Sequence, residues 1–357
     1  MRTLIVSSTR PYAGKSGIAL ALLSACASRG ASVGYFKPYG TMPVVADGVL
    51  TDQDAAYIAR FATSPAPVGG VCPVVQSRAF IEEVLREDPG GHVEHVKAAF
   101  AVASEGATAM VVEGPSDLSQ GRSVGLNLCA MAESLDAKVL LVDRPEGNEL
   151  PDSVLWAADC LGDRLLGVVF NAVHESTLEF VRGDVASFLK GRGLSVVGTV
   201  PRDPMLSSVS VEEIVEALGG TVLSAEEHVS EPVESFMVGA MGQEKALRFF
   251  RRKARKAVIT GGDRSDVQLA ALETDTRCII LTGNLPPSSL VLSRAEELGV
   301  PMILVGMDTL SAVEKMESLL GRVRLHDPIK AGRMREMFEA AVDVDALVSD
   351  AFGILSR

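Results

Sequence analysis

Short apolar runs alternate with stretches of helical periodicity along most of the chain. In the first part the runs predict strands at 4–7, 33–37, 109–113, 138–142, 165–171 and 195–200. The stretches between them predict helices at 17–28, 80–87, 92–104, 153–161 and 178–190. The runs are continuously apolar rather than alternating, which is typical of strands buried on both faces. This order predicts right-handed βαβ units and a parallel sheet with helices on both faces.

The alternation breaks at residues 219–235, which are polar and acidic and indicate a linker. A second series then predicts strands at 257–260, 278–281 and 302–305, helices at 264–273, 289–298 and 309–320, and a helical tail at 330–355. The 357 residues are enough for two or three domains. We expect a first domain at 1–220, a linker at 221–235, a smaller α/β domain at 236–345 and a C-terminal helical tail at 346–357.

The most informative motif follows the first predicted strand. Two serines end this strand, and a turn leads to Gly14-Lys15-Ser16 at the start of the first predicted helix. Strand, loop, Gly-Lys-Ser and helix is the order that a phosphate-binding P-loop requires. Lys15 would reach the β- and γ-phosphates, and the Ser16 hydroxyl could ligate Mg²⁺. The usual pattern has glycine where this chain has Thr9, and a Gly-Lys-Ser helix start without a ligand is the alternative.

Polar side chains also end other predicted strands. A carboxylate such as Glu113 at the end of a buried parallel strand lies beside the ligand crevice and suits Mg²⁺. Lys37 could bind a phosphate or an anionic substrate, and the Asn171 amide could read a base edge. Solvent-facing strand ends for Glu113 and Lys37, and a turn residue for Asn171, are the plainer alternatives. Before the next helical pattern, we interpret Asp52 as a solvated N-cap and Asp54 as a companion of Glu113.

These motifs resemble those of the dethiobiotin synthetase and cobyrinic acid a,c-diamide synthase group of P-loop proteins. Residues 8–16, Ser-Thr-Arg-Pro-Tyr-Ala-Gly-Lys-Ser, are similar to the group's G-T-D-T-x-x-G-K-T. Its K-P, D-A and E-G motifs and its nucleotide-base asparagine match Lys37-Pro38, Asp54-Ala55, Glu113-Gly114 and Asn171. The chain is still more similar to the synthetase-like N-terminal region of long phosphotransacetylases, which has Val-Val-Glu-Gly and a segment like 200–206.

The resemblance implies ATP and Mg²⁺ as cofactors. It implies nucleotide contacts from Thr9, Ala13, Gly14, Lys15, Ser16, Gly17, Asn171 and Pro201, metal contacts from Ser16, Asp54 and Glu113, and catalytic roles for Lys15, Lys37 and Glu113. The chain departs from dethiobiotin synthetases after Glu113-Gly114, where Pro-Ser-Asp replaces the group's A-G-G. Cys278 lies inside a predicted strand rather than on a nucleophile elbow. The departures argue against biotin-pathway and amidotransferase chemistry.

A glycine pair marks the second domain. Gly261-Gly262-Asp263-Arg264 follows a predicted strand and opens a helix. The glycines permit positive φ and close backbone approach, and Arg264 at a helix N-terminus favours an anion. A simple N-cap by Asp263 or Ser265 is the alternative.

Residues 236–345 resemble the DRTGG domain. That domain lies between the synthetase-like and catalytic parts of long phosphotransacetylases and occurs in regulatory proteins with nucleotide-sensing modules. Few residues follow 345, so we expect this chain to lack the acetyl-transferring domain.

Composition limits the classes of partner. Hydrophobic residues make up 47% and charged residues 22%, as in globular proteins, and the net charge of −12 argues against a general nucleic-acid partner. No apolar run reaches membrane-spanning length, and the N-terminus lacks a signal-peptide core, so we expect no membrane partner. The five cysteines form no C-x-x-C pair. We interpret them as buried free thiols in a reducing, cytoplasmic setting.

Two functions are consistent with the sequence. The first is a nucleotide-sensing regulator of a metabolic enzyme partner, with at most slow ATP hydrolysis. Apolar helix faces with Met334, Met337 and Phe338 favour a homodimer or higher homo-oligomer through the second domain. The second is an ATP-dependent ligase or synthase that acts on a carboxylate or amine substrate near Lys37 and Glu113. We favour the regulator because the substrate loop departs from the ligase pattern.

Overall fold

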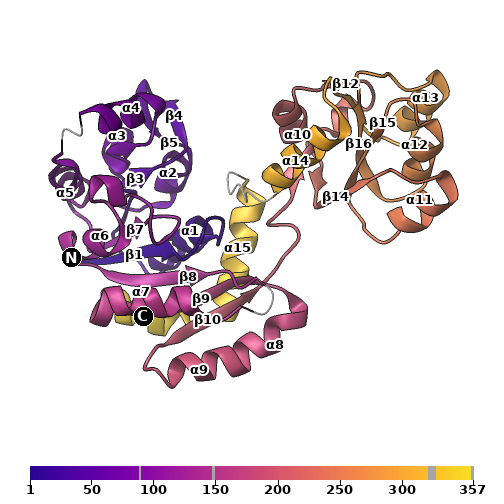
Figure 1. The fold of residues 1–357 in the computed structure, drawn as a ribbon. Coiled ribbons are helices and arrows are strands. Elements are labelled where there is room, and N and C mark those ends of the chain that lie inside the picture. Colours follow the sequence, from indigo (N-terminus) through magenta and orange to yellow (C-terminus); the bar gives the residue numbers. More distant parts are fainter. Residues whose placement is uncertain (88–89, 147–148, 321–326, 355–357) are drawn as a thin grey trace. The chain divides into compact units, whose positions relative to one another are not determined.

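Six parallel strands form the centre of the first unit, in the order β10-β9-β8-β1-β7-β2 (Figure 1). They are β1 (Arg2–Ser8), β2 (Val33–Phe36), β7 (Ala109–Glu113), β8 (Lys138–Asp143), β9 (Leu165–Val173) and β10 (Val196–Pro201). Every residue of β2 and β7 is buried, as expected of strands that are covered on both faces. The predicted α/β class with a parallel sheet is confirmed.

The computed structural model describes residues 1–87, 90–146, 149–320 and 327–354. The chain divides into one unit of Met1–Arg202 with Leu325–Arg357 and a second of Asp203–Arg324. This division differs from the expected boundaries at 220 and 345. The reason is that α15 (Pro328–Ala341) packs on α1 (Lys15–Ser28), and α16 (Val344–Phe352) packs on β1.

Helices cover both faces of the six-stranded sheet. Helix α1 is apolar on nearly all sides, which is typical of a buried helix, and it lies between the sheet and α15. Met334, Met337 and Phe338 are buried in α15 and belong to the first unit, so the expectation that they serve self-association of the second domain is wrong. The other face is covered by α5 (His92–Ala103), α6 (Leu128–Ser134), α7 (Asp152–Leu161) and α9 (Ala186–Lys190).

Smaller elements follow β2, and the sequence pattern predicts only two of them, the helix after Asp52 and the helix near residue 80. The smaller elements are β3 (Tyr39–Gly40), β4 (Pro43–Ala46), β5 (Val49–Asp52), α2 (Gln53–Ile58), α3 (Val68–Val71), β6 (Val74–Val75) and α4 (Arg78–Arg86). The helix expected at 178–190 is divided into α8 (Leu178–Phe180), a π-helical turn at Val181–Val185, and α9.

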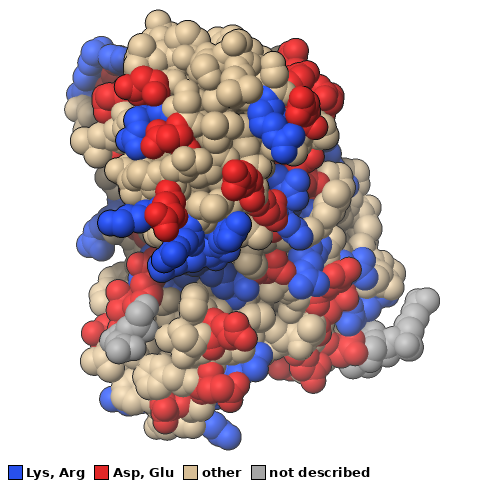
Figure 2. Space-filling view, turned by 90° about the vertical axis from the view of Figure 1, so that its right-hand side faces the viewer, with Lys and Arg blue, Asp and Glu red and all other residues tan. Residues whose placement is uncertain are grey.

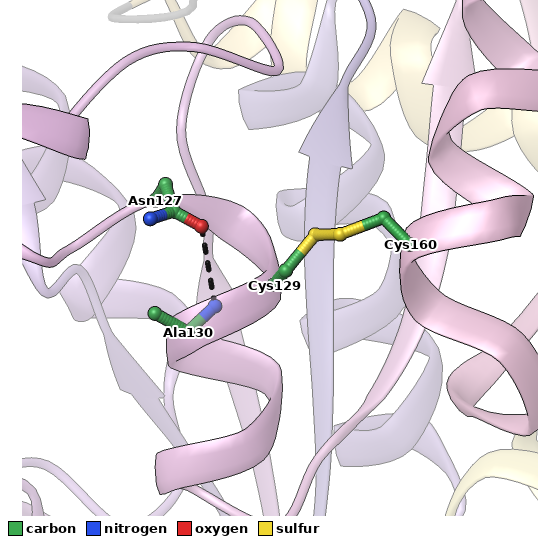
Figure 3. Close-up of a disulfide and its surroundings, with 4 residues drawn as sticks. All are labelled: Asn127, Cys129, Ala130 and Cys160. Atoms are coloured by element: carbon green, nitrogen blue, oxygen red, sulfur yellow. Dashed lines mark hydrogen bonds between the residues drawn. A yellow bond between two sulfur atoms is a disulfide. The ribbon is translucent and has the colours of Figure 1, made fainter.

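A disulfide joins Cys129 of α6 to Cys160 of α7, with Cα atoms 6.3 Å apart (Figure 3). The two helices pack against each other, which brings together cysteines that are 31 residues apart in the sequence. The prediction of free thiols is wrong for this pair, because the pairing depends on helix packing. Cys26, Cys72 and Cys278 are free and buried, as predicted. In the described part of the chain, the helices are too short or too polar to span a bilayer.

The second unit is a smaller α/β domain with the strand order β12-β17-β16-β15-β14. The parallel strands are β14 (Ser235–Val238), β15 (Lys256–Gly261), β16 (Thr276–Thr282) and β17 (Met302–Leu304). One apolar cluster includes side chains of α10 (Val211–Leu218) and α14 (Thr309–Leu320). Another includes side chains of α11 (Gln243–Phe250), α12 (Ser265–Leu272) and α13 (Ser289–Glu297).

The stretch expected to be a linker, 221–235, is part of this second unit. In it, β12 (Thr221–Val222) pairs antiparallel with β17, and β13 (Pro232–Val233) pairs with β11 (Val209–Ser210). These strands are only two residues long, so they leave no periodic pattern in a polar sequence.

Candidate functional site

The loop between β1 and α1 depends on the geometry of Gly14. Gly14 lies at the N-cap of α1 with φ 90° and ψ 22°, in the left-handed region that favours glycine. Its carbonyl accepts hydrogen bonds from the N–H groups of Gly17 and Ile18, at 3.1 and 3.2 Å. A side chain at this position would overlap the amide nitrogen of Asn171. The predicted P-loop is therefore built as a tight turn into the first helix.

The Glu113 carboxylate connects this loop to the edge of the sheet. It is fully buried, and its Oε1 lies 3.4 Å from Lys15 Nζ and 3.0 Å from Lys37 Nζ. Oε1 also accepts a hydrogen bond from the Ser16 hydroxyl at 3.1 Å, and Oε2 accepts one from the Tyr35 hydroxyl at 3.0 Å. Four residues singled out in the sequence, Lys15, Ser16, Lys37 and Glu113, thus meet at one point.

Lys37 lies between three carboxylates. Its side chain is buried, with Nζ 2.7 Å from Asp52 Oδ1 and 3.9 Å from Asp54 Oδ2. Asp52 caps α2 as predicted, by accepting from the backbone N–H of Ala55 at 3.1 Å. It is not solvated, however: it is fully buried, and its second oxygen accepts two further backbone N–H groups, both at 2.9 Å. The solvent-facing alternatives for Glu113 and Lys37 are excluded in the same way.

The charges at this point keep one another ionised. Burial alone would raise the pKa of Glu113, but the ammonium groups of Lys37 and Lys15 outweigh burial and lower this pKa. Burial alone would lower the pKa of Lys37, but the carboxylates of Glu113, Asp52 and Asp54 raise it. Burial and the nearby carboxylates raise the pKa of Tyr35 well above its usual value, so its hydroxyl keeps its proton and donates a hydrogen bond to Glu113.

A second acidic group lies beside the loop, at the end of β8. The Thr9 hydroxyl donates to the Asp143 carboxylate, and Arg10 Nε lies 3.8 Å from the same group. Burial raises the pKa of Asp143, although Thr9 and Arg10 oppose the shift. The sequence interpretation misses Asp143. Asp143 ends β8 as Glu113 ends β7, so both carboxylates lie at the carboxyl ends of parallel strands. This position could have identified Asp143 as a site residue from the sequence.

Asn171 lies two residues before the end of β9, and Pro201 ends the neighbouring strand β10. The Asn171 amide donates to the carbonyl of Ala13 at 2.8 Å, so it connects β9 to the P-loop. Pro201 ends β10 and is paired in register with Val173 of β9. The base-reading role of Asn171 and the nucleotide contact of Pro201 stay predictions.

The oxygen atoms around the loop suit magnesium bound together with phosphates. Within the residues that the structure describes, no group of three or more His, Cys, Asp or Glu side chains could hold a metal ion by itself. Mg²⁺ in nucleotide sites commonly uses one or two carboxylates, with the remaining ligands from phosphates and water. The Ser16 hydroxyl and the carboxylates of Glu113 and Asp54 provide hard oxygen donors of this kind.

The glycine turn of the second unit depends on close packing of the backbone at Gly262. Gly261 and Gly262 do not adopt positive φ. A side chain at Gly262 would instead collide with the carbonyl oxygen of Leu285, so close backbone approach explains this glycine. Of the two properties that glycine permits, the turn uses close backbone approach and not positive φ.

Arg264 occupies the N-cap of α12. Its guanidinium Nε lies 3.2 Å from Asp266 Oδ1, and its Nη2 donates to the carbonyl of Met241 at 3.0 Å. No side-chain hydrogen bond caps this helix, so the simple caps considered for Asp263 and Ser265 are not formed. The arginine expected to favour an anion is held by groups of its own domain.

Two known domain families match this chain, one in each of its two parts. Residues 2–210 match the family model described as AAA domain, and residues 213–319 match the DRTGG domain. The first match covers more than half of the chain, so the chain belongs to the AAA-domain family of P-loop proteins. A P-loop domain followed by a DRTGG domain is the predicted arrangement, and it is confirmed.

Curated relatives include two phosphate acetyltransferases. That of Pseudomonas putida is 26% identical over 366 residues, which cover 96% of this chain and 51% of the relative. That of Synechocystis sp. is 23% identical over 367 residues, which cover 97% of this chain and 51% of the relative. The chain spans about half the length of these relatives.

Solved structures resemble each part of the chain only loosely. The MinD cell division protein of Aquifex aeolicus has a TM-score of 0.37 at 15% identity and covers 58% of this chain and 84% of its own. The CBS and DRTGG domains of the regulatory region of Clostridium perfringens pyrophosphatase, complexed with the activator diadenosine tetraphosphate, have a TM-score of 0.30 at 16% identity. They cover 44% of this chain and 76% of their own.

Proposed function

We propose that the chain is an ATP- and Mg²⁺-binding regulator, in which nucleotide bound at the P-loop and a DRTGG domain together control a metabolic enzyme partner. The observation that carries the proposal is the contact of Glu113 with Lys15, Lys37 and Ser16 at the start of α1. Two buried or half-buried ammonium groups beside a helix N-terminus form a strong site for phosphate oxygens. We expect ATP hydrolysis to be slow at most.

Each residue has a definite role in this proposal. Lys15 binds the β- and γ-phosphates, and the backbone of Ala13, Gly14 and Gly17 surrounds them. When bound, Mg²⁺ neutralises phosphate charge, and Ser16, Glu113 and Asp54 would hold it. Thr9 fixes the loop through Asp143. Asn171, near the end of β9, and Pro201, at the end of β10, would contact the base.

The loop after Glu113 supports regulation over ligation. Ser116 bonds through its N–H and its hydroxyl to Gln120 Oε1, at 2.7 and 3.1 Å. Asp117 accepts from the Ser119 hydroxyl at 2.6 Å. The Ser116 and Asp117 side chains therefore bond within the loop, where dethiobiotin synthetases have glycines that approach substrate.

An ATP-dependent ligase or synthase is the second candidate, and the position of Lys37 favours it. This lysine is buried, ionised and 3.0 Å from Glu113, beside the P-loop, where it could bind a carboxylate substrate. A screen of carboxylate and amine metabolites with ATP and Mg²⁺, which measures ADP release, separates the two functions. Strong ADP release that depends on one metabolite would favour the ligase or synthase function over the regulatory one.

Calorimetric titration with ATP and Mg²⁺ tests the nucleotide site. We expect Lys15→Ala to weaken binding at least about tenfold, because a charge-assisted contact to phosphate contributes about 1.5–3 kcal/mol. Lys97→Ala is the matched control, since Lys97 is exposed and its one ion pair among the described residues is with Glu94 at 3.3 Å. Equal affinities of Lys15→Ala and the parent would refute the P-loop assignment.

We also propose a homodimer or higher homo-oligomer, because twofold symmetry is the commonest arrangement of soluble oligomers. Light scattering on the full chain measures its mass directly. A monomer at micromolar concentration would contradict this part of the proposal.

A further inference from the structure

A dense group of basic side chains lies in the second unit, outside the nucleotide site. Six of the 34 Lys and Arg residues fall within residues 245–255, a stretch without Asp or Glu. This basic patch consists of Lys245, Arg248, Arg251, Arg252, Lys253 and Arg255, all of them exposed. Because the chain has a net charge of −12, the rest of the chain carries −18 and the patch carries +6.

The patch is held in place by the buried side of α11. Ala246 and Phe250 are fully buried in the core of the second unit, and the cations follow on the exposed side and beyond the end of the helix. Figure 2, in which Lys and Arg are blue, shows several of these side chains gathered close together. The C-terminal end of a helix carries partial negative charge, which stabilises cations there.

Internal ion pairs account for only part of this charge. Arg255 Nη1 lies 2.9 Å from Glu234 Oε1, and Arg248 Nη2 lies 3.7 Å from Glu244 Oε1. No ion pair within the described ranges of the chain includes Lys245, Arg251, Arg252 or Lys253. Four exposed cations of this stretch are therefore left without an ion pair in the described residues.

The backbone of the patch is unsuited to a small oxyanion. The N–H groups of Arg251, Arg252 and Lys253 donate to the carbonyls of Leu247, Phe249 and Phe250. Sites for single phosphates usually combine backbone N–H groups with a helix N-terminus, and this patch has a helix C-terminus instead. Recognition must come from side-chain charge, which suits a ligand with several negative groups in a row.

The surroundings favour a short acidic ligand over a large one. Charges act over about 8 Å at physiological salt. A DNA duplex or an anionic membrane extends beyond the patch and would also meet other parts of the chain, which carry −18 in total. Single-stranded nucleic acid needs exposed rings for stacking, but Phe250 is buried and Phe249 is half-buried, with the Arg252 guanidinium 5.8 Å from its ring centre. We propose that the basic patch docks a short Asp- and Glu-rich segment of a partner protein.

A binding experiment with matched charge changes tests this inference without reference to nucleotide. The probe is a fluorescent decaglutamate peptide, and anisotropy measures its binding to the full chain. The test variant is Arg251→Glu/Lys253→Glu, which removes no ion pair found in the described residues. The control variant is Arg294→Glu/Lys315→Glu, on exposed helical positions of the same unit. It breaks one exposed ion pair, between Arg294 and Glu297 at 2.9 Å, which should contribute less than about 1 kcal/mol. Both variants bring the net charge from −12 to −16, so a difference between them reports on the patch alone.

We expect the patch variant to bind the peptide about tenfold more weakly than the parent, and the control variant to stay within about twofold. Binding of the parent should also be lost near 1 M salt, where charges act over only about 3 Å. Equal weakening in both variants would show a general charge effect and overturn the proposal. Tighter binding of a short DNA duplex, or of phosphatidylserine vesicles, than of the peptide would overturn it in favour of that ligand.

Discussion

Glu113→Gln is expected to destabilise the first unit by about 3 kcal/mol. At an effective dielectric constant of about 20, ammonium groups at 3.0 and 3.4 Å each attract the Glu113 carboxylate by about 5 kcal/mol. Relief of carboxylate desolvation offsets several kcal/mol of this loss. Lys37 keeps Asp52 at 2.7 Å, and glutamine can still accept one of the hydroxyl bonds. The net value therefore falls at the lower end of the range for breaking a buried ion pair.

Urea unfolding followed by tryptophan fluorescence measures this effect. Trp156, the single tryptophan of the chain, lies in α7, so its signal reports on the first unit. Glu94→Gln is the control, because Glu94 is exposed and its pair with Lys97 should contribute less than about 1 kcal/mol. A Glu113→Gln variant within about 1 kcal/mol of the parent would refute the reasoning that Glu113 is ionised and paired.

The pH dependence gives an independent check of the same prediction. The folded pKa of Glu113 is lowered, so its contribution to stability is present above the unfolded pKa of about 4.3 and is lost as pH falls through the folded pKa. The difference in unfolding free energy between the parent and Glu113→Gln should therefore shrink below pH ~4. A difference that is constant with pH would contradict the ionised state.

Three further predictions follow from other parts of the structure. Gly14→Ala should destabilise the first unit and weaken nucleotide binding. Gly30→Ala is the control, because Gly30 has a similar φ of 73° with open space around it; its free energy of unfolding in urea should fall by only about 1 kcal/mol. Burial lowers the pKa of Lys256 to about 8, so the unfolding free energy of the parent should rise from pH 8 to 10 relative to that of Lys256→Met. Unfolding followed by circular dichroism measures both values, and the same pH dependence in parent and variant would contradict the prediction. Thiol titration in denaturant should find three of the five cysteines before reduction, and five would exclude the Cys129–Cys160 bond.

The sheet and the centre of the candidate site could be predicted because both depend on short-range pattern. Continuous apolar runs predict β1, β7 and β8 as buried strands, whichever elements pack against them. The carboxyl ends of parallel strands share one edge, so a lysine at 37 and a glutamate at 113 had to lie near a P-loop that follows β1. Their convergence within 3.0 Å agrees with this reasoning.

Other features depend on packing that the sequence pattern does not contain. An aspartate before a helix predicts a cap, but the burial of Asp52 depends on the hairpin of β4 and β5 and on Lys37. The Cys129–Cys160 pair requires α6 and α7 to lie side by side. The sequence pattern after residue 327 predicts helices with an apolar face that packs on another element. It does not predict that this element is α1, some 300 residues earlier.

The return of α15 and α16 to the first unit has a consequence for folding during synthesis. Arg29, at the end of α1, bonds to Asp345 at 2.5–2.9 Å across a separation of 316 residues. At about 5–20 residues per second, the ribosome needs roughly 15–60 s to make the chain between them. During that time the apolar outer side of α1 lacks its cover, while the whole of the second unit emerges and is free to fold. We expect the nascent P-loop domain to be the stage at which this chain depends on chaperones, and a chain truncated before α15 to aggregate.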